Sequence, residues 1–296
     1  MSGQTNIVRT TAFTGLLVLP ALAWFATRDL PAWVVMWALA VSMFFALKLL
    51  TLTAAELSTV SFVRIFAYIA LWPGMDARAF LFDRPDNKPV ARPSELAFAL
   101  LKLFGGLAAG AWATWNVRTA QPMLVGWVGM IGIIFTLHFG LLHVISWLWR
   151  RAGVNASPIM RAPIAADSLA DFWGGRWNMA FADAARRFLF RPTVRWFGAR
   201  GAGAFVFLVS GLVHEAVVSL PARGGWGGPT LYFLIQGAGI AVEKSPLGKH
   251  LILGSGLRGW AWTALCTLAP VTLLFHAHFV HRVIVPLFEF IAGMAP

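Results

Sequence analysis

Long apolar stretches separated by short polar breaks dominate the chain. A helix needs roughly 20 apolar residues to cross a hydrocarbon core of about 30 Å. Stretches of this kind, some of them shorter, cover residues 10–27, 31–52, 95–115, 123–149, 202–220, 229–242 and 259–280. Residues 57–72 form a shorter apolar segment that carries Arg64, so we expect a tilted, re-entrant or interfacial helix there. The pattern predicts an all-α polytopic membrane protein with about seven or eight transmembrane helices plus interfacial helices.

One polar interval, residues 150–200, interrupts this pattern in the middle of the chain. It holds nine arginines and three aspartates, a net charge of +6. Positive charge between spans is typical of cytoplasmic loops. We therefore expect an integral membrane protein of a bacterial inner membrane, or of an equivalent cytoplasm-facing membrane, with this loop on the cytoplasmic side.

The same loop contains a predicted interfacial helix. Its apolar residues recur at the spacing i, i+4, i+7 and i+8, which places them on one helix face: Phe181, Ala185, Phe188 and Leu189. Such a helix lies in the membrane surface, and we expect Pro192 to end it. Asn178, just before the helix, would then be held near that surface beside a row of arginines.

Composition supports the membrane interpretation and narrows the partners. Hydrophobic residues make up 58% of the 296 residues and charged residues only 12%, against roughly 25% charged in soluble domains. Half of the net charge of +12 lies in the basic loop, which favours membrane lipids or a phosphorylated substrate and not nucleic acid. No internal repeat or second domain is evident, so we predict a single domain over residues 1–296.

His214 is the strongest candidate for chemistry. It lies deep in a predicted span, where ionisable groups are costly and by default functional candidates, although a hydrogen-bonded structural histidine remains the alternative. Ser210 lies one turn earlier on the same helix face and would orient the ring. Glu215 points about 100° away from His214, so we expect it to pair with another helix.

The remaining histidines raise the alternative of a metal site. Imidazole suits iron and zinc, and the spacings His-x4-His and His-x-His-x-x-His occur at His138/His143 and at His276/His278/His281. The chain lacks the His-x-x-His-His box of membrane di-iron desaturases, and no carboxylate cluster replaces it. We therefore expect no metal and keep a lipid oxidoreductase and a non-catalytic transporter as alternatives.

Two motifs connect these candidates. Phe172-Trp173-Gly174-Gly175-Arg176-Trp177-Asn178 precedes Ser210-Gly211-Leu212-Val213-His214-Glu215. Together, in this order, they resemble the membrane-bound O-acyltransferase (MBOAT) superfamily, and within it the wax-synthase-like branch. The resemblance implies tilted helices around a central catalytic chamber. Gly175 departs from the pattern, since many members carry a second basic residue there.

The resemblance implies transfer of a fatty acyl group from acyl-CoA to a lipophilic alcohol, with acyl-CoA as co-substrate and no other cofactor. His214 would act as general base, and Asn178 would donate to the thioester oxygen or position the acyl donor. We expect Trp173 and Trp177 to shape the tunnel and Ser210 and Glu215 to line the site. The arginines would face the anionic CoA moiety: Arg176, Arg186, Arg187 and Arg191.

Overall fold

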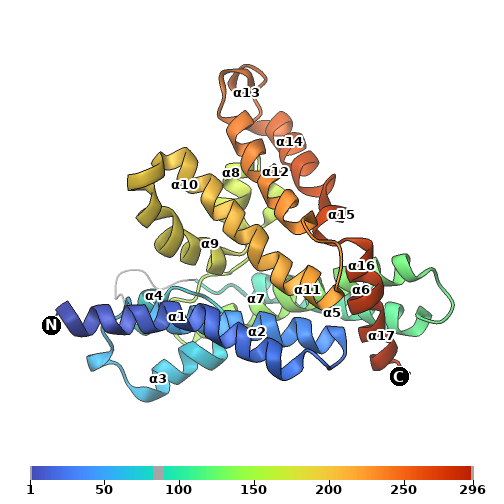
Figure 1. The fold of residues 1–296 in the computed structure, drawn as a ribbon, viewed down its shortest axis with the longest axis horizontal. Helices are drawn as coiled ribbons and strands as arrows, with labels where there is room; N and C mark the ends of the chain where they lie inside the picture. Colours follow the sequence, from blue (N-terminus) through green and yellow to red (C-terminus); the bar gives the residue numbers. More distant parts are fainter. Residues whose placement is uncertain (1, 83–89, 295–296) are drawn as a thin grey trace. The chain divides into compact units, whose positions relative to one another are not determined.

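The computed structural model describes residues 2–82 and 90–294, which form helices and connecting loops without a β-strand (Figure 1). Their contacts divide the chain into two compact units. The first unit comprises the chain up to Ile159 together with the segment from Leu287, and the second unit is Met160–Pro286. The protein is an all-α polytopic membrane protein, as predicted, whereas the single domain over residues 1–296 stays a prediction.

The first unit is a set of long apolar helices with short turns between them. The hairpin of α1 and α2 packs side by side, and α5 packs against α6 and the π-helical turn η3 (Figure 1). The elements of this unit are α1 (Ser2–Thr27), α2 (Ala32–Leu52), η1 (Leu57–Thr59), α3 (Phe62–Phe66), η2 (Ala67–Leu71), α4 (Ala77–Leu81), α5 (Pro93–Asn116), α6 (Pro122–Ile134), η3 (Phe135–Leu141) and α7 (Leu142–Arg151). The last helix of the chain, α17 (Val285–Ile291), belongs to it from Leu287 onward.

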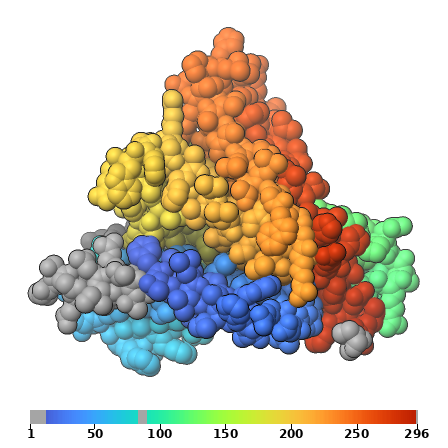
Figure 2. Space-filling model, viewed as in Figure 1, coloured from blue at the N-terminus to red at the C-terminus, as the bar shows by residue number. Residues whose placement is uncertain are grey.

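The second unit contains both sequence motifs. Its core pair is α10 beside α12, drawn in yellow and orange, and Figure 2 shows the same two helices in contact. Its elements are η4 (Pro163–Ala165), α8 (Leu169–Asp171), η5 (Phe172–Arg176), α9 (Met179–Ala185), η6 (Arg186–Phe190), α10 (Arg191–His214), η7 (Glu215–Ser219), α11 (Leu220–Ala222), α12 (Gly228–Glu243), α13 (Pro246–His250), α14 (Gly256–Leu268), α15 (Val271–Leu274), α16 (Ala277–Phe279) and η8 (Val280–Ile284).

Four helices in the described residues are long and apolar enough to cross a membrane, or five if one bent pair forms a single span. The four are Ala32–Leu52, Pro93–Asn116, Pro122–Arg151 and Met179–Ala222. Two further apolar helices, Phe13–Thr27 and Phe62–Leu71, are shorter. The expected total of seven or eight spans therefore stays a prediction.

The predicted span over residues 259–280 is not one straight helix. The chain bends by 57° between Gly256–Leu274 and Ala277–Ile291. At the break, the backbone N–H of Phe279 donates to Nδ1 of His276 at 3.1 Å, so His276 caps a new helix instead of continuing the old one. The apolar pattern alone could indicate neither this capping side chain nor this change of direction.

The prediction that Pro192 ends the interfacial helix is wrong. Pro192 lies in the first turn of α10, directly after the π-helical turn η6 that already interrupts the regular hydrogen-bond ladder. Within the stretch Met179–Ala222 the helix continues past Pro192 as far as the kink at Gly198. The bend comes later, at Gly198, whose φ of 62° and ψ of 175° are not helical. A straight helix of this length would measure roughly 66 Å at about 1.5 Å per residue, twice the thickness of the hydrocarbon core. The bend at Gly198 divides this stretch into two helices.

Candidate active site

His214 ends α10, and its ring has a defined orientation. The ring Nδ1 lies 2.7 Å from the backbone carbonyl oxygen of Ser210, one turn earlier. A carbonyl only accepts, so this contact requires the proton on Nδ1 and leaves Nε2 with its lone pair. No hydrogen bond to Nε2 occurs within the described part of the chain. The side chain is therefore held in the tautomer that can accept a proton.

Ser210 orients this ring as expected, but through its backbone and not through its hydroxyl. The Ser210 hydroxyl donates to the carbonyl oxygen of Val206 at 2.9 Å. Gly211, the next residue of the motif, has another function: a Cβ there would lie 2.7 Å from Cα of Thr230. The glycine lets α10 approach α12 closely, as small residues do between membrane helices.

Glu215 follows His214 and binds the beginning of α12. Its Oε1 accepts from the backbone N–H groups of Gly227 and Thr230, at 2.9 and 3.1 Å, and from the Thr230 hydroxyl at 3.0 Å. A carboxylate at a helix N-terminus satisfies N–H groups that have no partner within the helix. Glu215 thus pairs with another helix, as predicted. Its second oxygen, Oε2, is buried without a hydrogen-bond partner in the described residues.

The middle of α12 brings the two motifs together through Phe233. The Phe233 ring lies 4.5 Å from the His214 ring and 5.5 Å from the Trp173 ring, measured between centroids. The indole Nε1 of Trp173 donates to Oε1 of the fully buried Gln236 at 3.2 Å, and the Gln236 amide donates to the carbonyl oxygen of Cys266 at 2.7 Å. Trp173 is consequently fixed from one side by aromatic contacts and from the other by a buried amide.

The end of α12 holds the start of the first motif. The Glu243 carboxylate accepts from the backbone N–H of Leu169 at 2.7 Å, and the Ser168 hydroxyl caps the same short helix by accepting from Asp171 N–H at 3.1 Å. Phe233, Gln236 and Glu243 are neighbours of the two motifs that the sequence pattern did not indicate. A lone polar residue in an apolar segment, such as Gln236, is the signal that would have indicated one of them.

Asn178 adopts a left-handed backbone, with φ of 45°, and caps α9. Its Oδ1 accepts from the backbone N–H of Phe181 at 3.5 Å, and its own backbone N–H points to the sulfur of Met160 at 3.2 Å. Because the amide oxygen faces the helix, the Nδ2 group is the end free to donate elsewhere. The predicted position of Asn178 at the start of a helix is confirmed.

The four arginines that were predicted to face CoA divide into two groups. Arg176 forms an ion pair with Asp171, and Arg186 donates to the carbonyl oxygen of Gly174 at 2.9 Å, so both brace the motif. Arg187 and Arg191 have no ion pair with the residues that the structure describes. Gly175 lies close to the same carboxylate, since a Cβ there would be 2.8 Å from Oδ1 of Asp171. Trp177 stacks on Phe172 with ring centroids 5.5 Å apart.

Two of the histidines outside the motifs, His143 and His276, have hydrogen-bond partners of their own. His143 contacts Glu95 and Lys102, each at 2.8 Å, and His276 lies 3.3 Å from the Ser219 hydroxyl. No group of three or more His, Cys, Asp or Glu side chains suited to a metal ion occurs in residues 2–82 and 90–294.

The segment that carries the candidate site is similar to known proteins. The model of the Membrane bound O-acyl transferase family matches residues 156–235, a range that holds both motifs and the first half of α12. The predicted resemblance to this superfamily is confirmed over this segment of the chain.

Curated relatives narrow the resemblance to the wax-synthase-like branch. The chain is 34% identical over 182 residues to the long-chain-alcohol O-fatty-acyltransferase of Simmondsia chinensis, covering 54% of this chain and 50% of that protein. It is 36% identical over 101 residues to the probable long-chain-alcohol O-fatty-acyltransferase 1 of Arabidopsis thaliana, covering 31% and 29%. An acyl-CoA–sterol O-acyltransferase of the same plant is 30% identical over 132 residues, covering 40% and 38%. The aligned region spans half or less of each of these relatives.

Proposed function

We propose that the protein transfers a fatty acyl group from acyl-CoA to the hydroxyl of a lipophilic alcohol and gives a wax-type ester. One observation carries the proposal: Nδ1 of His214 is bound to the Ser210 carbonyl, which leaves Nε2 as a base in a segment that matches the family. An alcohol has a high pKa and must lose its proton as it attacks a thioester, so a positioned neutral imidazole suits this reaction.

In the proposed reaction, Nε2 of His214 takes the hydroxyl proton while the alcohol oxygen attacks the thioester carbonyl carbon. The C–O bond forms and the C–S bond breaks, and the protonated His214 gives the proton to the departing CoA thiolate, which yields the ester, free CoA and neutral His214. The Nδ2 group of Asn178, whose Oδ1 is engaged by Phe181, would donate to the carbonyl oxygen as negative charge develops there. No serine or cysteine nucleophile is required.

The two substrates would meet at the membrane surface. The basic interval favours a cytoplasmic position for the loop, and Arg187 and Arg191 are the arginines best suited to the phosphates of CoA, since Arg176 and Arg186 are engaged within the motif. Trp173 and Trp177 would line the path of the fatty acyl chain. The acceptor alcohol would reach the site from the lipid phase, and we propose that residues 1–296 act as one domain in this reaction.

The test is ester formation by the purified protein from labelled acyl-CoA and a long-chain alcohol. His214→Ala should reduce the rate by roughly 10²–10⁴-fold, the usual contribution of a general base, with Ser210→Ala as a matched control, because Ser210 acts through its backbone carbonyl. Full activity of His214→Ala would contradict the proposed mechanism. Stoichiometric iron or zinc would favour a lipid oxidoreductase, and substrate flux in liposomes without acyl-CoA consumption would favour a transporter.

A further inference from the structure

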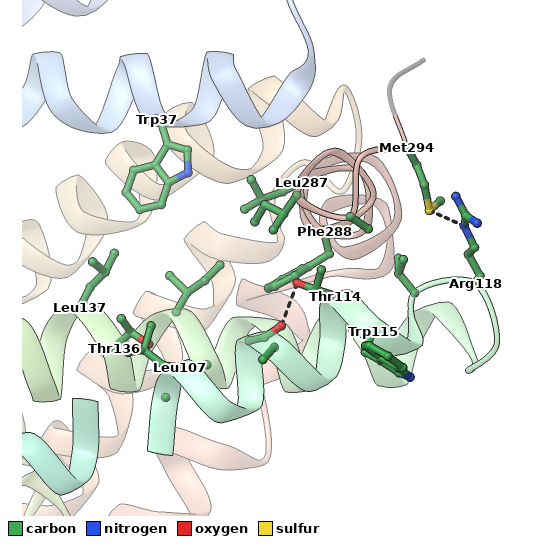
Figure 3. A pocket seen from close by; sticks show the side chains of 18 residues that line it. Trp37, Leu107, Thr114, Trp115, Arg118, Thr136, Leu137, Leu287, Phe288 and Met294 are labelled. Carbon is green, nitrogen blue, oxygen red and sulfur yellow. Dashed lines mark hydrogen bonds between the residues drawn. The ribbon is translucent and has the colours of Figure 1, made fainter. Parts of the chain in front are cut away.

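An open apolar groove of about 890 Å³ runs along the first unit, away from both motifs in the sequence (Figure 3). Its walls come from α5, from α6 with η3, and from α17 with the residues that follow it, and Trp37 of α2 also lines it. The volume lies within the range of roughly 300–1,000 Å³ typical of small-molecule sites. The groove is therefore large enough for an extended ligand.

Glycines shape the floor of this groove. A Cβ at Gly132 would lie 2.7 Å from the backbone N of Gly110, and a Cβ at Gly106 would meet Thr136, so α5 and α6 are in direct backbone contact there. Gly110 also lines the groove, yet a Cβ at this position would meet nothing within 4 Å. The open space above Gly110 is thus part of the groove and not of a helix contact.

The position of the groove in the membrane indicates the chemistry of its occupant. Pro93–Asn116 and Pro122–Arg151 are both candidate spans by length and composition, and both line the groove. At the depth of such spans, acyl chains are the available partners. Arg118 lies in the turn between these spans and is the single charged residue among the described residues that line the groove. A residue between two spans lies at the level of the lipid headgroups.

Arg118 provides the feature that distinguishes one lipid from another. Its Nε donates to the sulfur of Met294 at 2.9 Å, beyond the end of α17, as Figure 3 shows. This contact fixes the side chain beside the groove and leaves the terminal guanidinium nitrogens to pair with an anionic oxygen. An acyl chain gains little by moving from lipid into an equally apolar groove, so the headgroup must supply the selectivity.

We propose that this groove binds an anionic glycerophospholipid of the surrounding bilayer, with one acyl chain over Gly110 and the phosphate beside Arg118. The inference rests on the first unit alone and is independent of the acyl-transfer chemistry. It predicts a preference of about fivefold for phosphatidylglycerol over phosphatidylcholine of the same chain length, as one arginine at a membrane surface gives for an anionic lipid.

The test is native mass spectrometry of the purified protein in micelles that contain equal amounts of the two phospholipids. Arg118→Gln should keep bound lipid but lose the preference. Gly110→Leu should fill the groove and reduce bound phospholipid at least fivefold. Gly105→Leu is the matched control, since Gly105 lies on the same helix with equally open space but does not line the groove.

Three outcomes would overturn the proposal. They are equal retention of the two phospholipids by the unchanged protein, unchanged retention by Gly110→Leu, and equal loss from both leucine variants. Thermal unfolding of each variant in the same micelles separates lost lipid from lost fold, because a folded Gly110→Leu protein without bound phospholipid is the result that the groove predicts.

Discussion

Glu215 offers the sharpest test of how the second unit works. Its Oε1 accepts three hydrogen bonds from Gly227 and Thr230 at the beginning of α12, and Phe233 of the same helix contacts the His214 ring. If these contacts position α12, then loss of the carboxylate should loosen Phe233 against His214. Replacement by alanine and by glutamine separates the two properties of the carboxylate, its hydrogen bonds and its charge.

The expected sizes follow from the contacts. Hydrogen bonds to charged groups contribute about 1.5–3 kcal/mol each, but these three share one oxygen and act together as a helix cap, which is worth about 1 kcal/mol and up to 2. We expect Glu215→Ala to lower the free energy of unfolding by about 2 kcal/mol, the upper end of that range. Glu215→Gln keeps an oxygen acceptor and loses only the charge at the helix end, so it should cost about 1 kcal/mol.

The assay combines unfolding in detergent micelles with ester formation, measured at a temperature where every variant is folded. Glu215→Gln should retain ester formation to within about tenfold, a loss of about 1.4 kcal/mol at most, and Glu215→Ala should lose more activity together with stability. A Glu215→Gln protein as stable as the unchanged protein but inactive would refute this reasoning, because the carboxylate would then act in the chemistry itself. Unchanged stability of Glu215→Ala would refute it equally.

Three further substitutions test other contacts. Asn178→Gly should be about 1 kcal/mol more stable than Asn178→Ala, because φ of 45° suits glycine, while both lose ester formation; equal melting temperatures would contradict the left-handed backbone. Trp173→Phe should lower the free energy of unfolding by about 1–3 kcal/mol, because Oε1 of Gln236 loses its donor. In a double-mutant cycle, adding Gln236→Leu should recover part of that loss. Lys48→Met should also lower the free energy of unfolding by about 1–3 kcal/mol, because the fully buried Lys48 donates to the Gly74 carbonyl oxygen at 2.5 Å. An unchanged melting temperature would count against that contact.

Local pattern was sufficient for several features of the site. Apolar length predicted the membrane helices, since a span is a property of consecutive residues. The position of Asn178 before a helix and the divergence of Glu215 from His214 both follow from helical periodicity, and the structure confirms them. The two motifs, read together, were enough to indicate the superfamily.

Contacts between distant residues required the tertiary structure. Phe233, Gln236 and Glu243 become neighbours of the motifs only because α12 packs along α10 and beside α8. The sequence shows that Arg176 is charged but not whether it is paired. Only the tertiary structure shows its ion pair with Asp171. Hydrogen-bond partners are chosen by packing across helices, where sequence distance carries no information.

The sequence by itself determined that the chain is an all-α membrane protein and where His214 and Asn178 lie along it. Only the tertiary structure decided that α12 joins the two motifs, that the helix continues past Pro192 and bends at Gly198, and that Nδ1 of His214 faces the Ser210 carbonyl. The physical reason is that hydrophobic period and length are local properties. The direction of a helix after a bend and the partner of a buried polar group depend on what packs against them.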